Sequence, residues 1–230
     1  MKEILCNSAY FGVTVSLIGY GAGIMLKKKF KYAFLNPLLI SIIFVIGVVM
    51  LCGVDYESYE NSAQYLSYLL TPATVCLAVP LYQQMTLLKK NLAAVACGIL
   101  AGVLASLGSV LLLAFLFGLE HDVYVTLLPK SITTAIGMGV SEELGGLVTI
   151  TVAVIIVTGV IGNVIGEAVC KLVRIYEPIA KGLALGTSSH AIGTAKALEM
   201  GEVEGAMSSL SIAVAGLMTV VAVPIMSGLL

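Results

Sequence analysis

The stretch "GTSSHAIGTAKALEMG" (residues 186–201) places hydroxyls, a histidine, a lysine and a glutamate between two strongly apolar parts of the chain. An earlier stretch, "TTAIGMGVSEELGG" (residues 133–146), aligns with it at a constant offset of 56 positions. The alignment matches Ala135 with Ala191, Gly137 with Gly193 and several neighbours, and an apolar segment follows each copy. We infer an internal duplication, with repeat unit A at 123–170 and repeat unit B at 182–229.

The composition around these two stretches is that of an integral membrane protein. Of the 230 residues, 59% are hydrophobic and only 11% are charged, and the mean hydropathy is +1.06. Soluble domains carry roughly 25% charged residues. Continuous apolar runs of about 20 residues suit membrane-spanning helices and lack the alternation of a β-barrel. We therefore expect an all-α, polytopic protein that forms a single membrane domain over residues 1–230.

Six apolar segments are long enough to cross the bilayer, and the first four form an N-terminal part at residues 1–120. They lie near residues 4–26, 33–53, 64–88, 92–118, 147–170 and 205–229. Two further segments, 123–143 and 182–200, are apolar but interrupted by polar residues and glycine.

The basic residues predict the orientation, because Lys and Arg concentrate in cytoplasmic loops. They follow the first span (27–31), the third (89–90) and the fifth (171–181). Nine of the twelve Lys and Arg residues become cytoplasmic if the N-terminus lies outside and both interrupted segments are re-entrant hairpins. We therefore predict a multi-pass membrane protein with an external N-terminus.

This topology makes the two repeat units inverted copies of each other. Inverted repeats with broken helices, and with a binding site where the breaks meet, are typical of secondary transporters. Glycines 137, 139, 186 and 193 are the expected positions of the breaks.

Helix contacts and a further interruption are also expected. Pro72 and Pro80 interrupt the third span, either as simple kinks or to turn Thr71 and Thr74 toward the site. Three glycine pairs at i, i+4 favour close helix packing, although glycine is also generally abundant in membrane helices; they are Gly19 with Gly23, Gly98 with Gly102, and Gly162 with Gly166.

Placing an ionisable group at membrane depth costs free energy, so such groups indicate function. His190 either exchanges a proton, given an ordinary pKa near 6.5, or only hydrogen-bonds within the fold. Lys130 attracts an anion or extends to the interface. Lys196 and Glu199 are spaced to pair on one helical face. The predicted substrate-binding residues are Thr71, Thr74, Lys130, Ser131, Thr133, Thr134, Ser188, Ser189, His190 and Thr194.

Several classes of function find no support. The five cysteines show no CxxC spacing, so neither a disulfide framework nor a metal site is expected. Hydrolase, metalloprotease and phosphate-loop motifs are absent from the sequence. We expect no enzymatic activity, no cofactor and no nucleic-acid partner.

Three segments together resemble a known family: "LLTPATVCLAVPLYQQ", "LLPKSITTAIGMGVSEELGG" and the run containing "SHAIGT". The chain resembles the LrgB/CidB family over nearly its whole length. The resemblance implies a location in the inner membrane of a bacterial cell and one of two functions. Members are described as antiholin-like regulators of murein hydrolase activity and autolysis, acting with a holin-like LrgA/CidA partner, and also as transporters of small carboxylates such as pyruvate. A plastid relative is regarded as a glycolate/glycerate carrier.

We expect transport of a small monocarboxylate by alternating access, in a homodimer. The alternative is the antiholin-like regulator with its separate LrgA/CidA partner. The polar hairpins favour transport, since a regulator has little use for broken helices at membrane depth.

Overall fold

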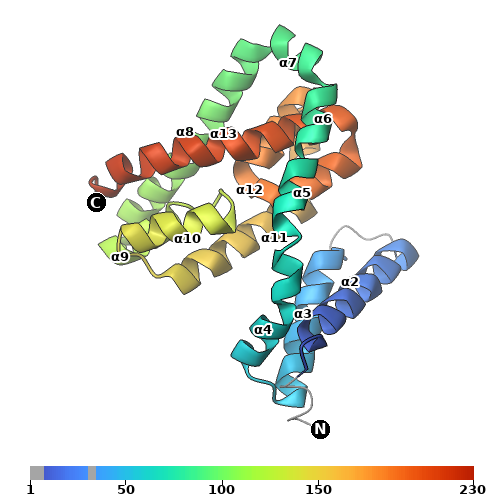
Figure 1. Cartoon of the computed structure of the whole chain (residues 1–230). Coiled ribbons are helices and arrows are strands. Elements are labelled where there is room, and N and C mark those ends of the chain that lie inside the picture. Colours follow the sequence, from blue (N-terminus) through green and yellow to red (C-terminus); the bar gives the residue numbers. More distant parts are fainter. Residues whose placement is uncertain (1–7, 31–34) are drawn as a thin grey trace. The chain divides into compact units, whose positions relative to one another are not determined.

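The computed structural model describes residues 8–30 and 35–230, except for the side chains of Leu70, Thr71 and Thr74. All regular elements in these ranges are α-helices (Figure 1), which confirms the all-α prediction for the described chain. The helices form two compact units, Met1–Cys76 and Leu77–Leu230. Organisation as a single membrane domain stays a prediction.

The first unit is built around α2, which packs against α3 and α4. Gly19 and Gly23 provide the closest approach, since a Cβ on Gly23 would lie 2.6 Å from the carbonyl oxygen of Pro37. This confirms the first glycine pair as a helix contact. The described helices of the unit are α2 (Phe11–Phe30), α3 (Pro37–Cys52), α4 (Tyr56–Ser67) and α5 (Leu70–Cys76).

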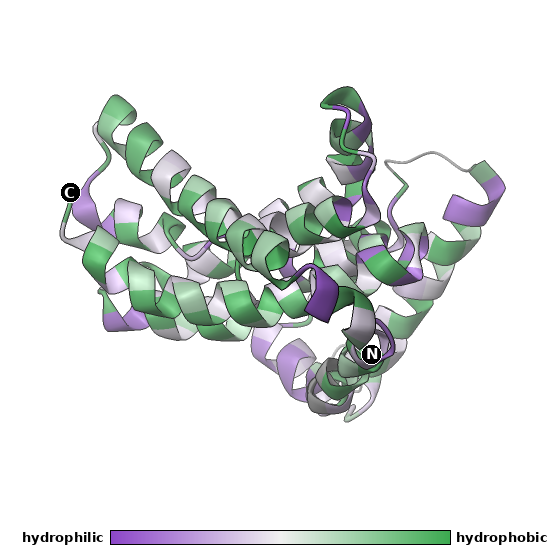
Figure 2. Ribbon diagram, turned by 90° about the horizontal axis from the view of Figure 1, so that it is seen from above, coloured by the Kyte–Doolittle hydropathy of each residue, from purple (hydrophilic) through white to green (hydrophobic). Residues whose placement is uncertain are grey.

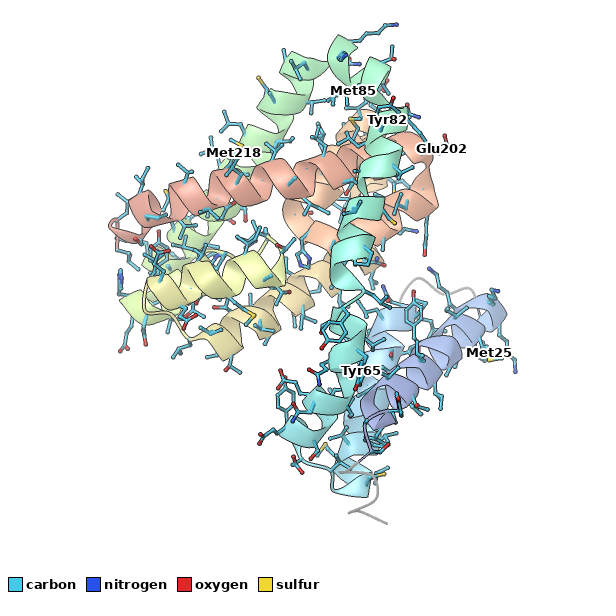
Figure 3. The ribbon with its side chains drawn as sticks, in the orientation of Figure 1. Met25, Tyr65, Tyr82, Met85, Glu202 and Met218 are labelled. Carbon is cyan, nitrogen blue, oxygen red and sulfur yellow. The ribbon has the colours of Figure 1, made fainter. Side chains whose placement is uncertain are left out.

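Local signals set the boundaries and partners of α3 and α4. The side chain of Asn36 caps α3 by accepting from the amide of Leu38 at 2.7 Å, and Gly53 ends the helix in the left-handed conformation. The ring of Tyr65 on α4 (Figure 3) stacks on that of Tyr10 with the centroids 6.0 Å apart. Helix α4 therefore lies against the start of α2.

The second unit contains the longest helices and both of the sequence stretches that align at the offset of 56. Three of its helices, α8, α11 and α13, are long and apolar enough to cross a membrane. They confirm the predicted spans at 92–118, 147–170 and 205–229, whereas the count of six spans stays a prediction. The helices are α6 (Ala78–Gln83), α7 (Met85–Lys90), α8 (Leu92–Phe117), α9 (His121–Leu127), α10 (Thr134–Glu143), α11 (Val148–Leu172), α12 (Pro178–Met200) and α13 (Glu202–Ser227).

The segment expected to form a single span at 64–88 is instead divided among short helices. Pro72 is the third residue of α5, and Pro80 is the third residue of α6. A proline in the first helical turn removes an N–H group that has no intrahelical acceptor there. The prolines therefore start new helices in this segment, which agrees with the predicted interruption of the third span at Pro72 and Pro80.

Polarity in the second unit is distributed as in a membrane protein. Figure 2 shows the long helices as hydrophobic along most of their length and hydrophilic at turns and ends. Large apolar side chains such as Phe115, Leu116 and Ile161 are exposed, while Ser141, Thr151 and similar hydroxyls are completely buried. Hydroxyls can be buried when other protein groups accept and donate their hydrogen bonds.

Small residues allow the helices of the second unit to approach closely. Gly98 and Gly102 of α8 lie against Leu183 and Thr187 of α12. Gly162 and Gly166 of α11 lie against Ser189 and Leu185, which also belong to α12. The two remaining predicted glycine pairs are thus confirmed as helix contacts, with α12 as the common partner.

A third close contact joins α12 to α13. A Cβ on Gly182 would lie 2.5 Å from the carbonyl oxygen of Glu204, and one on Gly186 would lie 2.5 Å from that of Ser208. Because both obstacles are backbone atoms, they cannot move aside as a flexible side chain can. The sequence analysis did not predict Gly182 and Gly186 as a pair that packs helices together.

Gly186→Ala is expected to destabilise the fold by about 1–3 kcal/mol, the usual cost of overpacking. The measurement is thermal unfolding in detergent, followed by circular dichroism at 222 nm. Gly108→Ala is the control, because a Cβ at this α8 position meets nothing within 4 Å. Equal melting temperatures for the two variants would contradict the proposed packing.

Candidate functional site

The two interrupted segments both fold back on themselves. Hairpin A consists of α9, residues 128–133 and α10, and hairpin B is α12, with a first arm at 178–188 and a second arm at 191–200. In hairpin A, Thr151 of α11 contacts both arms through the Thr126 carbonyl at 3.0 Å and the Ser141 hydroxyl at 2.7 Å. In hairpin B, Gly182 and Leu198 both lie against the first turn of α13.

The break in α12 falls at Ser189 and His190. Ser189 has φ −136° and ψ 16°, and His190 has φ 41° and ψ −139°. The predicted glycine breaks were wrong, since Gly186 and Gly193 lie inside the helical arms and residues 137 and 139 inside α10. These glycines, except the open Gly139, are needed for close packing and not for backbone freedom.

His190 is held in its positive-φ conformation by contacts with α11. Its side chain is buried, with 3% of its surface exposed, and Nε2 lies 2.9 Å from the carbonyl oxygen of Ile155. Gly159 leaves room for the ring, because a Cβ there would lie 2.7 Å from Cε1. A protonated Nε2 donates this hydrogen bond, so the imidazole fastens the break to α11. Proton coupling through His190 stays a prediction.

The hydroxyls around this break are hydrogen-bonded within the hairpin and to α13. Ser188 donates to the Ala184 carbonyl at 2.7 Å and lies 3.0 Å from the Ser189 hydroxyl. Thr194 donates to the His190 carbonyl at 3.0 Å and pairs with Ser208 at 2.7 Å. Ser188 is the exposed member of the group, whereas Ser189 and Thr194 are buried.

The tip of hairpin A forms a second polar cluster with α8. The Lys130 ammonium lies 3.1 Å from the Ser131 hydroxyl and 3.4 Å from the Ser106 hydroxyl. The two hydroxyls are 2.8 Å apart. The structure thus brings together two predicted site residues and adds a third, Ser106.

Helix α8 brings the two tips to neighbouring positions. Gly102 contacts Thr187 near the end of the first arm of hairpin B, and Ser106 contacts Ser131 at the tip of hairpin A. Four helical residues advance about 6 Å. The tips therefore meet α8 about one turn apart, near the middle of a 26-residue helix.

Thr133 and Thr134 lie where α10 begins. Thr133 is the N-cap residue, and its side chain makes no capping hydrogen bond. Ile136, in the first turn, reaches Gly216 of α13. The positive end of the α10 dipole thus lies beside the middle of another spanning helix. The side chains of Thr71 and Thr74 lie outside the described residues.

A charged cluster lies where hairpin B opens. Lys196 of the second arm pairs with Glu167 of α11 at 2.9 Å and with Glu199 at 3.7 Å, which confirms the predicted i, i+3 pair. Lys171 also pairs with Glu167, at 2.8 Å, and Lys181 lies 3.9 Å from Glu204. These side chains line a cavity of about 570 Å³.

A groove of about 520 Å³ follows the contact between α8 and the first arm of hairpin B. Its lining extends from Asn91 and Glu177 to Gly102 and Thr187. It therefore connects the end where hairpin B opens with the level of the tips.

Sequence analysis missed two residues of the site, Ser106 and Ser208. Each had a weak signal, since Ser106 is one of two serines in an apolar span and Ser208 is the first of three serines near the start of the last span. Within the described residues, no group of three or more His, Cys, Asp and Glu side chains is placed to hold a metal ion.

The model of the LrgB-like family matches residues 16–229. The chain belongs to the LrgB-like family. The antiholin-like protein LrgB of Bacillus subtilis (strain 168) is 40% identical over 219 residues, which cover 95% of each chain. The proteins of the same name from Bacillus mycoides (strain KBAB4) and Bacillus cereus (strain B4264) are each 41% identical over 216 residues, or 94% of each chain. No solved structure matches the chain.

His190→Gly is expected to be more stable than His190→Ala by about 1 kcal/mol. Both variants lose the bond to Ile155, but only glycine accepts φ 41° without steric cost. Melting temperatures in detergent measure the difference. A lower melting temperature for the glycine variant would contradict the view that the His190 backbone is strained.

Proposed function

We propose that the chain is a membrane carrier for small monocarboxylates. The observation that supports this most directly is the meeting of two hairpin tips at the middle of α8. Broken helices at membrane depth are tolerated where they are buried in protein or line a polar cavity. Such breaks form the binding sites of secondary transporters.

The two repeat units act as inverted copies in this proposal. Hairpin A contacts Thr151 near the start of α11, and hairpin B contacts Glu167 near its end, so they enter from opposite ends. One contact also recurs at the offset of 56. Thr126 contacts Thr151 in the first unit of the repeat, and the residues 56 positions later, Gly182 and Met207, contact each other in the second. Two inverted halves around one site provide the symmetry that alternating access requires.

The charge distribution supports a cytoplasmic position for the open end of hairpin B. Lys171, Arg174 and Lys181 lie there, and basic residues mark the cytoplasmic side of a membrane. The N-terminus is then external and the chain is a multi-pass protein of the bacterial inner membrane. The groove along α8 connects this side with the tips.

The polar groups at the tips suit a small anion. Lys130 supplies one positive charge, and the hydroxyls of Ser131 in hairpin A and Ser106 in α8 lie 3.1 and 3.4 Å from its ammonium. An ammonium with neighbouring hydroxyls matches a carboxylate that carries an adjacent hydroxyl or keto oxygen. Pyruvate, glycolate and glycerate are therefore the proposed substrates.

Purified protein in liposomes is expected to take up radiolabelled pyruvate, glycolate or glycerate in a saturable manner. Lys130→Met should reduce this uptake at least tenfold, because it removes the charge that attracts the substrate. Uptake is measured by filtration, with protein-free liposomes and Gly108→Ala protein as controls. Absence of uptake of all three acids, with or without an LrgA/CidA partner, would contradict the proposal.

The relatives favour a second function. The three reported relatives are each named antiholin-like protein LrgB, and the comparisons support this function better than they support transport. In this alternative the chain regulates murein hydrolase activity and autolysis together with a holin-like LrgA/CidA protein. Homodimer formation belongs to the transport proposal.

Complementation of a gene deletion distinguishes the two functions. If regulation is direct, Lys130→Met restores wild-type autolysis, since this variant retains the surface of the protein. If the effect on autolysis follows from carboxylate transport, Lys130→Met fails to restore it although wild-type protein does. Autolysis is followed as loss of optical density, and immunoblots confirm equal amounts of both proteins in the membrane.

A further inference from the structure

Ser106 lies near the middle of α8, whose sequence is otherwise almost entirely apolar. Its hydroxyl, the Ser131 hydroxyl and the Lys130 ammonium form a closed triangle with sides of 2.8, 3.1 and 3.4 Å. Ser131 is buried, with 6% of its surface exposed. A scaffold helix and a hairpin tip thus converge on one cation.

Lys130 differs from the lysines near hairpin B in what it contacts. Lys171, Lys181 and Lys196 each lie within 4 Å of a glutamate. The described contacts of Lys130 are two neutral hydroxyls, although its side chain is only partly exposed. Hydroxyls orient an ammonium but leave its charge uncompensated, and burial makes an uncompensated charge costly.

Only one of the two hydroxyls has to donate within the triangle. Lys130 is a donor only, so both serine oxygens accept from it, and one serine proton suffices for the bond between the two serines. At least one serine proton therefore remains to be donated. Thr134 begins α10 three residues after Ser131, and the N-terminal end of that helix adds partial positive charge.

We propose that Ser106 is a substrate-binding residue which, with Lys130 and Ser131, holds the carboxylate of a small monoanion at the tip of hairpin A. This inference rests on the proposed transport function and names its anion subsite. The single ammonium balances one carboxylate, so the site selects monocarboxylates over dicarboxylates and phosphate. Ser106 lies on α8, whereas Lys130 and Ser131 lie on hairpin A. Movement of the hairpin along α8 would therefore separate the groups that bind the carboxylate.

The test measures binding and transport separately. Equilibrium binding of radiolabelled glycolate is measured on detergent-purified protein, and uptake is measured in liposomes. Ser106→Ala is expected to weaken glycolate binding about tenfold and to raise KM similarly, because one hydrogen bond to a charged group is lost. Lys130→Met should abolish saturable binding.

Ser109→Ala is the matched control, because Ser109 lies on the same helix and its hydroxyl donates to the Ser106 carbonyl at 2.7 Å. It should bind glycolate as the wild type does. Circular dichroism melts establish that the variants are folded, and Ser106→Thr, which retains the hydroxyl, should restore most of the affinity lost in Ser106→Ala. Unlabelled malonate and inorganic phosphate should compete poorly.

The outcomes separate the subsite from the transport function. Uptake by the wild type with equal affinities for Ser106→Ala and Ser109→Ala overturns the subsite and leaves transport standing. Binding that depends on Ser106 without any uptake supports the subsite and overturns transport. Absence of both binding and uptake overturns both, and tighter binding of phosphate than of glycolate overturns the monocarboxylate class.

Discussion

A helix that breaks inside a membrane exposes backbone N–H and C=O groups that hydrocarbon cannot satisfy, so protein groups must surround the break. The second unit of this chain is organised around that constraint. The break at Ser189 and His190 packs against Gly159 and Gly162 of α11, and Asn163 donates to the Ile192 carbonyl at 2.6 Å. Among the described residues, no buried side-chain nitrogen or oxygen lacks a hydrogen-bond partner.

The same constraint accounts for the use of glycine and serine. A break can be enclosed only if neighbouring helices approach closely, and helices in lipid do so through small residues. Gly182 and Gly186 bring α12 onto the backbone of α13, and Gly98 and Gly102 bring it onto α8. Hydroxyls such as Thr194 and Ser208 then pair across the contact. A polar interior and an apolar exterior follow together.

Charge is distributed according to the same logic. At the open end of hairpin B, lysines and glutamates pair near the surface, where their hydration is partly retained. At the tips, one lysine faces hydroxyls only. The first arrangement needs no further partner, whereas the second is the anion site that we propose. This difference, and not the total charge of the chain, is the basis of that proposal.

Sequence patterns predicted the parts of this structure that depend on local chemistry. Hydropathy gave the three long spans because hydrocarbon requires about 20 apolar residues. The spacing of Gly162 and Gly166 predicted a helix contact because such a pair lies on one helical face. The glycine breaks were predicted wrongly, because backbone freedom is only one reason for glycine, and here close packing was the stronger one.

The sequence by itself determined the helical class, the three long spans and the position of the polar hairpins, since each follows from composition or spacing along the chain. Only the tertiary structure decided that His190 forms the break and that Ser106 meets Lys130. His190 keeps φ 41° because Ile155 and Gly159, more than 30 residues away, fix its ring. Ser106 reaches Lys130 because folding brings it to the tip of a hairpin, and no local pattern in the sequence predicts that contact.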